Sequence, residues 1–316
     1  MSKYTIRWVL THDPIALFED AARHFASSVL EASGGVLEVL VQTPTEYGGG
    51  VRVSPAEVMR KVTNGDLEMS QTYTTVLGKL HNKLWVLDMP FLFESHEHAS
   101  RVLDGPLGMD LLAGLTPHGL RGLGFTYSGG YRIISSTTRE IHKLEDLKGL
   151  NVRTSFNPVV QELFSSLGAT PHPAQLQAVP AMTATGSIDA AESTWPRYWD
   201  MGHSSAQPIV NQTSHSLFLT SLVMNEVFYQ RLPPELRKVI HRCALDTARR
   251  ERDKSIADAE EARKTYLSQG GVVITPSSSE LDRLERATDG VYARFEPEFG
   301  KTLISEIRQQ AVRAVA

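Results

Sequence analysis

Residues 144–153 have the sequence LEDLKGLNVR, and this stretch decides the fold more than any other. Its first half has the composition of a short helix that ends at Gly149. Its second half runs into residues 151–154, a short strand that carries Arg153. Asn157 and Pro158 follow and predict the start of another helix. The local order is therefore helix, strand, helix around one arginine.

The chain before this stretch alternates between strand and helix patterns. Strands are predicted at residues 4–10, 36–41 and 67–71, with helices at 18–30 and 55–62 between them. Such an order predicts a parallel sheet flanked by helices, because parallel strands need crossover connections.

The chain after this stretch forms a second compact set. It continues with a helix at 158–167 and a strand at 188–192. A helical pattern then runs from Leu236 past Leu267 to Gly270, roughly 50 Å if unbroken. A helix of that length is expected to touch two domains. A last helix is predicted at 279–295.

Composition excludes several classes of protein. The 316 residues are 41% hydrophobic and 22% charged, which is typical of a globular chain and not of a disordered or collagen-like one. Lys and Arg number 32 against 36 Asp and Glu, so no basic excess indicates binding to nucleic acid or to an anionic membrane. Cys243 is the single cysteine, which excludes an internal disulfide.

No enzyme signature is present. The sequence lacks the nucleophile elbow, the phosphate loop, the dinucleotide fingerprint and the HExxH zinc motif. His96 and His98 alternate on a predicted helix, so they do not face each other as metal ligands would. We therefore expect no catalytic residue, no metal and no cofactor.

Arg153 is the one side chain whose place predicts chemistry. It lies at the end of a short strand, at the edge of an α/β sheet where ligands bind. A guanidinium can hold a carboxylate through two parallel hydrogen bonds. A structural salt bridge is the alternative, and the residues alone leave both open.

Short segments spread along the chain together carry a resemblance to a known family. They are MPFLF at 89–93 with His98, VLDGPLG at 102–108, GYR at 130–132, LEDLKGLNVR at 144–153, Pro158, LGA at 167–169 with Pro171, GSIDAAE at 186–192 and LPPE at 232–235. Over nearly its whole length the chain resembles the substrate-binding proteins of tripartite ATP-independent periplasmic (TRAP) transporters, the DctP-type family.

The resemblance implies a two-lobed α/β fold of the periplasmic-binding-protein type, in which each lobe is a sheet flanked by helices and one long helix spans both. We expect lobe I to hold residues 1–127 and about 218–255, and lobe II to hold 128–217 and about 256–316. The implied function is to capture a small organic carboxylate in the cleft between the lobes and to deliver it to a TRAP-type permease. The alternatives are a cytoplasmic enzyme whose carboxylate substrate is anchored by Arg153, with Asp13 or Glu192 as acid or base, and a binding protein that serves a sensor.

The resemblance also implies roles for two arginines. Arg153 corresponds to the residue that clamps the substrate carboxylate, and Arg132 to a second arginine that assists. Two positions depart from the family pattern. Ser193 stands where an asparagine is usual, and Ala178 stands where a glutamate is usual.

Positions at strand ends complete the expected ligand site. They are His12, Asp13, Gln71, Tyr73, Phe156, Asn157, Glu192, Ser193, Trp195 and His215. Phe156, Trp195 and Tyr73 are expected as aromatic walls, which predicts a ligand with apolar or ring character in preference to a sugar acid.

The expected location follows from the family. Met1, Ser2 and Lys3 are followed at once by a strand pattern, so the sequence given shows no signal peptide. We expect either a cytoplasmic protein or a mature periplasmic chain with a new start methionine, and the resemblance favours the second. A monomer is expected.

Overall fold

The computed structural model describes residues 3–11 and 16–311, which divide into two compact units. The first unit is made of Met1–His81, Ser100–Tyr127 and Leu219–Lys254. The second unit is made of Asn82–Ala99, Ser128–Phe218 and Ser255–Ala316. The segment 82–99 thus belongs with the second unit, whereas the sequence placed it in lobe I. Its Asp88 accepts a hydrogen bond from Asn157 at 2.7 Å.

The first unit is built on a sheet whose strand order is β2-β1-β3-β9-β4. The bounds are Tyr4–Leu10 for β1, Leu37–Gln42 for β2, Met69–Tyr73 for β3, Leu217–Asn225 for β9 and Leu120–Ser136 for β4. The first three strands are parallel, as the sequence predicted, and β9 returns antiparallel to β3. Helix α1 (Ala16–Ala32) buries one face, including Phe18 and Phe25, against Trp8 of β1. Other helices of this unit are α2 (Pro44–Tyr47), α3 (Pro55–Asn64), α4 (Thr74–Leu77), α6 (Pro106–Ala113) and α10 (Glu226–Arg231), and α5 (His96–Asp104) ends in it.

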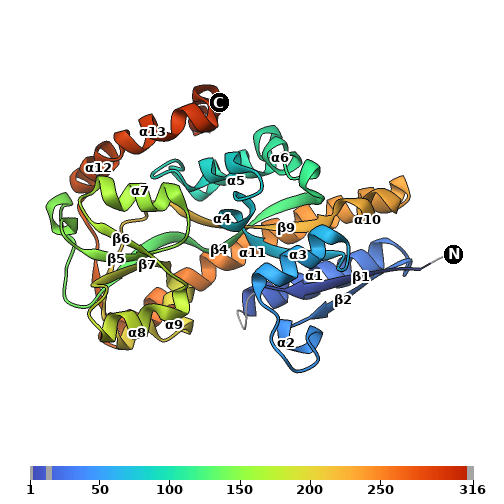
Figure 1. Ribbon diagram of the computed structural model, residues 1–316, viewed down its shortest axis with the longest axis horizontal. Helices are drawn as coiled ribbons and strands as arrows, with labels where there is room; N and C mark the ends of the chain where they lie inside the picture. The colour runs from blue at the N-terminus through green and yellow to red at the C-terminus, as the bar shows by residue number, and fades with distance from the viewer. Residues whose placement is uncertain (1–2, 12–15, 312–316) are drawn as a thin grey trace. The chain divides into compact units, whose positions relative to one another are not determined.

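The second unit has the strand order β4-β7-β5-β6, with β8 paired to β4 and β10 paired to β8. The bounds are Asn151–Thr154 for β5, Thr170–Pro173 for β6, Ala190–Thr194 for β7, Ile209–Asn211 for β8 and Val272–Ile274 for β10. Figure 1 shows α7 (Pro158–Ser166) on one face of these strands, and α8 (Val179–Ala184) and α9 (Trp195–Asp200) on the other. Side chains alternate along β5, so Val152 packs in the core with residues of α7 while Arg153 faces away from that core.

The stretch 144–153 forms the local structure that the sequence predicted. A short helical segment, η3 (Leu144–Leu147), is followed by Gly149 with φ of 76°, a left-handed conformation that glycine adopts without strain. Strand β5 begins two residues later. Asn157 then caps α7, because its Oδ1 accepts a hydrogen bond from the Val159 N–H at 2.8 Å.

The long helix predicted from the sequence is α11, which spans the 35 residues Pro234–Ser268. Its residues up to Lys254 belong to the first unit and those from Ser255 to the second. None of the helices in the described part of the chain is both long and apolar enough to cross a membrane.

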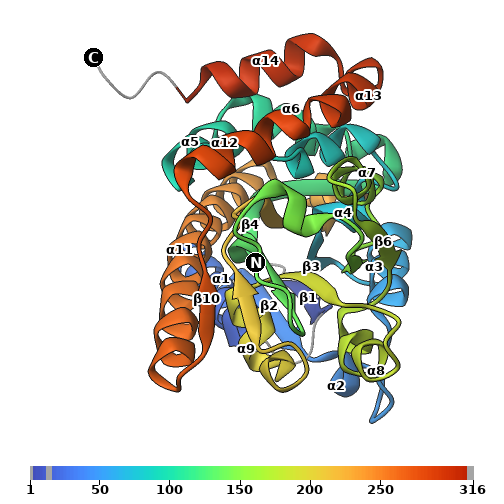
Figure 2. The same cartoon turned by 90° about the vertical axis from the view of Figure 1, so that its left-hand side faces the viewer.

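The prediction of one final helix at 279–295 is wrong. The chain after α11 and β10 forms α12 (Ser278–Ala287), α13 (Asp289–Phe299) and α14 (Lys301–Gln309), which follow one another in red in Figure 2. The first break falls at Thr288, whose hydroxyl donates to the Glu285 carbonyl at 2.6 Å. A threonine hydroxyl that binds a backbone carbonyl competes with helical hydrogen bonding.

Candidate functional site

The second unit holds a buried ion pair between Arg132 of β4 and Glu192 of β7. Arg132 lies opposite Thr194 in the antiparallel pairing, and Glu192 lies opposite Ile134. The two side chains are therefore diagonal neighbours on one face of the sheet. Arg132 NH1 donates to Glu192 Oε2 at 2.6 Å, and the two residues are 1% and 0% exposed. The Arg132 guanidinium also lies 3.9 Å from the centre of the Phe218 ring.

Arg153 of β5 lies beside this pair and is oriented by backbone carbonyls. Its Nε and NH2 both donate to the Ala174 carbonyl, and its NH1 donates to the Glu192 carbonyl at 3.3 Å. Carbonyl oxygens orient a guanidinium and leave its full positive charge in place. Because Arg153 is only 6% exposed, that charge acts in a medium that screens it little.

Glu192 is the negative centre of the group. Burial raises the pKa of its carboxyl, but the nearby charges of Arg132 and Arg153, together with a hydrogen bond from the Ser155 N–H, bring that pKa below its usual range. The carboxylate is therefore ionised at neutral pH. Arg153 and the Ser155 amide are thus held at fixed positions around it.

A second acid, Asp88, lies on the other side of Arg132. Its carboxylate is 4.0 Å from Arg132 NH2 and accepts a hydrogen bond from Asn157 Nδ2 at 2.7 Å. Burial raises the pKa of Asp88 to about 7, and the attraction of Arg132 offsets this only in part. Near neutral pH, therefore, Glu192 carries the full negative charge and Asp88 only part of one.

Two histidines near the arginines are neutral. Burial lowers the pKa of His215 to about 4, the charge of Glu192 opposes this lowering in part, and Arg132 adds to it. Burial also lowers the pKa of His203 to about 4, with further lowering by Arg153 and Arg197. Each imidazole therefore offers one donor and one acceptor nitrogen at neutral pH.

Several polar atoms of this unit are buried without a hydrogen-bond partner in the described part of the chain. They are Arg132 Nε and NH2, Thr154 Oγ1, Ser155 Oγ, Ser193 Oγ, both ring nitrogens of His203, His215 Nε2 and Ser216 Oγ. Buried polar groups are normally hydrogen-bonded, so a set of this size on one unit indicates a polar binding site. Over residues 3–11 and 16–311 no group of three or more His, Cys, Asp or Glu is arranged to hold a metal ion.

The structure brings together five of the predicted site residues, which are Arg132, Arg153, Asn157, Glu192 and His215. Ser193 follows Glu192 on the same strand and is 2% exposed. Trp195 is 3% exposed and packs against Tyr198 and Tyr266, with its N–H bonded to Gln212 at 2.8 Å.

Of the other predicted residues, one is exposed, two belong to the first unit and two fall outside the described residues. Phe156 is 48% exposed. Tyr73 and Gln71 belong to the first unit, where Gln71 is buried and its Nε2 lies 2.7 Å from Glu251 Oε1 and 2.9 Å from Thr126 Oγ1. His12 and Asp13 lie outside the described residues.

Sequence reasoning missed Asp88, Ser155, Arg197 and His203. Asp88 left a signal, because it is the one charge inside the apolar run LWVLDMPFLF at 84–93. A charge inside such a run is buried with its neighbours and needs a partner. Ser155 acts through its backbone N–H, which no side-chain pattern marks.

Known proteins match the whole of this architecture. The family model of bacterial extracellular solute-binding protein, family 7, matches residues 11–298. The C4-dicarboxylate-binding protein DctB of Bacillus subtilis is 26% identical over 290 residues, which are 91% of this chain and 81% of that protein. A TRAP periplasmic solute-binding protein of Ochrobactrum anthropi has 26% identity and a TM-score of 0.88, and the match covers 98% of this chain and 95% of the other.

A third similar protein, from Bradyrhizobium sp. BTAi1, is a TRAP periplasmic solute-binding protein in complex with galacturonate. It is 28% identical with a TM-score of 0.85, over 97% of this chain and all of the other. The fold and the family define a solute-binding protein of two-lobed α/β type and not an enzyme. This chain belongs to the bacterial extracellular solute-binding protein family 7, whose members are periplasmic.

Proposed function

We propose that the second unit captures a small hydroxylated carboxylate, with Arg153 as the anchor of the carboxylate group. The observation that carries this proposal is the orientation of the buried Arg153 guanidinium by the carbonyls of Ala174 and Glu192. A guanidinium fixed in this way is preorganised, so little conformational freedom is lost when it binds a carboxylate.

Arg132 and Glu192 serve a second purpose in this proposal. Their ion pair holds the strands β4 and β7 in register next to Arg153 and supplies a rigid charged wall. Asp88, which accepts a hydrogen bond from Asn157, lies 4.0 Å from Arg132 on the other side. The carboxylate ligand then meets a site whose cations are already positioned.

The hydroxylated character of the ligand is supported by the buried polar atoms without a protein partner. Ser155, Ser193, His203 and His215 offer hydroxyl and imidazole groups of the kind that bind sugar hydroxyls. Trp195, expected as an apolar wall, is packed in a core cluster instead. The galacturonate bound by the Bradyrhizobium relative is consistent with such a ligand.

We further propose that the protein works as a monomer in the periplasm and delivers its ligand to a TRAP-type membrane permease. Its large exposed apolar side chains, such as Leu30, Val51 and Val227, are scattered over separate segments, as in monomeric proteins. Sedimentation velocity checks the monomer, and co-purification with the membrane subunits checks the delivery.

Calorimetry with D-galacturonate tests the anchor. Arg153→Ala is expected to weaken binding by about two orders of magnitude, because it removes a charge-assisted pair in a buried site. Arg153→Lys is also expected to be impaired, since a point charge does not replace the planar fork. Arg139→Ala, an exposed arginine of the same unit, is the matched control. If a folded Arg153→Ala variant binds within threefold of wild type, Arg153 is not the anchor of the carboxylate.

Competition between two carboxylates tests the ligand class. D-galacturonate is expected to bind at least about tenfold more tightly than benzoate, a difference of about 1.4 kcal/mol. Tighter binding of benzoate would restore the apolar ligand that the aromatic residues of the sequence predicted.

A further inference from the structure

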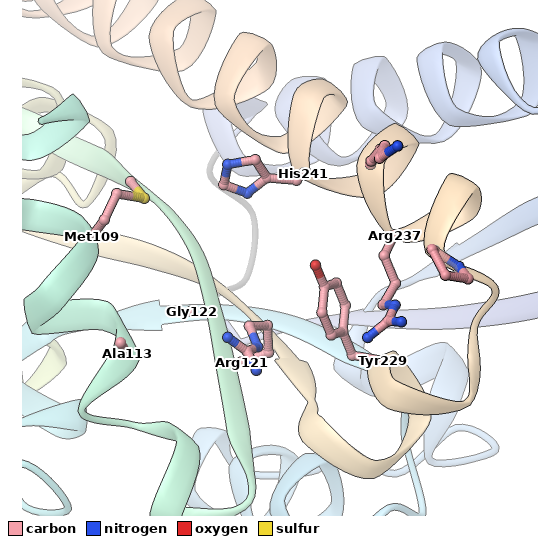
Figure 3. Close-up of a pocket in the computed structure, with 9 residues that line it drawn as sticks. Met109, Ala113, Arg121, Gly122, Tyr229, Arg237 and His241 are labelled. Carbon is pink, nitrogen blue, oxygen red and sulfur yellow. The ribbon is translucent and has the colours of Figure 1, made fainter. Parts of the chain in front are cut away.

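The first unit contains a hollow of about 440 Å³ that the proposed function does not use. It lies among α6, the start of β4, α10 and the first turns of α11 (Figure 3). The residues that line it are Met109, Ala113, Arg121, Gly122, Tyr229, Pro234, Arg237, Lys238 and His241. Three of these described residues are cations and one is a histidine, and none is an acid.

Two of the cations are held in place by a chain of hydrogen bonds. Arg121 donates two hydrogen bonds to the Glu226 carboxylate, from Nε at 2.8 Å and from NH2 at 2.6 Å. The Gln230 amide donates to the same carboxylate at 2.7 Å, and its oxygen accepts from Arg237 NH1 at 2.7 Å. One carboxylate and one amide of α10 thus position an arginine from β4 and another from α11.

Tyr229 adds an aromatic wall. The Arg121 guanidinium lies 5.0 Å from the centre of its ring. In Figure 3 the ring lies between Arg121 and Arg237, and its hydroxyl points toward the side of the hollow where His241 lies. Met109 and Ala113 of α6 line the opposite, apolar side.

The charges around the hollow do not balance. Glu226 neutralises Arg121. Glu235 lies 3.2 Å from Lys238, but because Glu235 is 79% exposed, solvent weakens this ion pair. Within the described part of the chain, the partner of Arg237 is the neutral amide of Gln230, and no carboxylate lies within 4.0 Å of it. One positive charge therefore remains at a preorganised guanidinium.

We propose that this hollow is a binding site for a phosphoryl group. Its hydrogen-bond donors come from Arg121, Arg237, Lys238, His241 and the Tyr229 hydroxyl. Together they can donate more hydrogen bonds than the two oxygens of a carboxylate accept in one plane. A phosphoryl dianion presents three acceptor oxygens and about two negative charges, which suits this number of donors. The apolar side formed by Met109, Ala113 and the Tyr229 ring has room for an organic group attached to the phosphate.

Calorimetry on the full chain tests the site with two probes, inorganic phosphate and phenyl phosphate. Wild type is expected to bind both, and phenyl phosphate more tightly because its ring packs on the apolar side. Arg237→Gln is expected to weaken both by about tenfold or more, since it removes the unbalanced guanidinium. Arg242→Gln removes the same charge further along α11, outside the hollow, and is expected to change binding by less than about twofold.

Two further measurements identify the ligand class and keep the two sites apart. Phosphate binding is expected to persist in Arg153→Ala, because that arginine belongs to the second unit. Benzoate is expected to bind the hollow more weakly than phenyl phosphate. The proposal is overturned if neither phosphate probe binds, if Arg237→Gln and Arg242→Gln weaken binding equally, or if benzoate competes as well as phenyl phosphate.

Vesicles distinguish the two sources of a phosphoryl group. Co-sedimentation with vesicles that contain phosphatidic acid, lost in Arg237→Gln and absent for pure phosphatidylcholine, assigns the site to a lipid headgroup. Phosphate binding in solution without such co-sedimentation assigns it to a soluble phosphate ester. Co-sedimentation that Arg237→Gln leaves unchanged counts against the hollow as the site.

Discussion

Each of the two units buries one glutamate almost completely. The pKa values of the two carboxyls are shifted in opposite directions. Burial raises the pKa of Glu251 in the first unit well above its usual range, and the hydrogen bond from Gln71 and the charge of Arg252 offset this only in part. Burial acts in the same direction on Glu192 in the second unit, yet Arg132 and Arg153 bring that pKa below its usual range.

The difference lies in the partners and not in the depth. Glu192 touches a guanidinium at 2.6 Å. Glu251 touches the neutral amide of Gln71, while its neighbour Arg252 is bound to Asp104 at 2.8 Å and to the Phe125 carbonyl at 2.7 Å. A cation in direct contact favours the charged form of a buried acid, whereas a neutral partner offsets the effect of burial less. The first unit therefore contains a neutral polar core, and the second a charged site.

The largest expected effect comes from removing Arg132, the cation that contacts Glu192. Arg132→Met is expected to lower the free energy of unfolding by about 3–5 kcal/mol, because it leaves the Glu192 carboxylate buried without its partner. Urea unfolding at pH 7 measures the loss. Arg139→Met on the exposed surface is the control, with an expected change within about 0.5 kcal/mol. A loss below about 1 kcal/mol for Arg132→Met would mean that Glu192 does not depend on this cation.

The pH dependence of stability should separate the two glutamates by sign. Glu251 keeps its proton in the folded chain above its unfolded pKa of 4.5, so its contribution is full below that pH and is lost as the pH rises. Glu251→Gln is expected to remove this loss. The free energy of unfolding should then fall less steeply as the pH rises above 5, by up to about 1.4 kcal/mol per pH unit.

Glu192 is the control for that experiment, because its lowered pKa gives the opposite sign. Its contribution is present above the unfolded pKa of 4.5 and is lost as the pH falls below it. Glu192→Gln should therefore change the acid side of the stability curve and not the side above pH 5. Identical slopes for wild type and Glu251→Gln above pH 5 would show that Glu251 is ionised in the folded chain.

The smallest expected effect concerns the hydroxyl contacts around Gln71 in the neutral polar core of the first unit. The Thr220 hydroxyl contacts Thr126 Oγ1 and accepts from Gln71 at 3.1 Å, so Thr220→Val is expected to cost about 1 kcal/mol in urea unfolding. Thr72 is a matched control, since its buried hydroxyl has no partner within the described residues. Thr72→Val is expected to be neutral or slightly stabilising. Equal losses in the two variants would mean that the hydroxyl contacts of Thr220 contribute nothing.

The sequence predicted the α/β fold and the long helix well, because strand and helix periodicities and glycine stops are local signals. Arg132, Arg153 and Glu192 were also predicted, and they lie together because their strands are neighbours in one sheet. Gln71 shows the limit of this reasoning. The sequence predicted that it ends a strand, but β3 (Met69–Tyr73) continues for two residues beyond it. The direction of its side chain depends on Glu251, which is 180 residues away in the chain.

The rest of the site depends on contacts that no local pattern marks. Asp88 lies in a 3₁₀ segment, Asn82–Asp88, without helical or strand periodicity. The hollow of Figure 3 combines residues of four elements from Met109 to His241, and its charge imbalance becomes visible only when the partners of each cation are known. Such groupings need the tertiary structure.

The division of the first unit into three separate segments has a consequence for biosynthesis. Its last segment, Leu219–Lys254, supplies β9, which pairs with β3, and the part of α11 that packs on the β1 core. A ribosome delivers these residues only after the greater part of the second unit has emerged. The N-terminal unit therefore cannot finish folding first, although domains usually fold in the order of synthesis. A nascent chain that stops before residue 219 leaves one side of β3 without its partner β9, and such an unpaired edge is open to pairing with other strands.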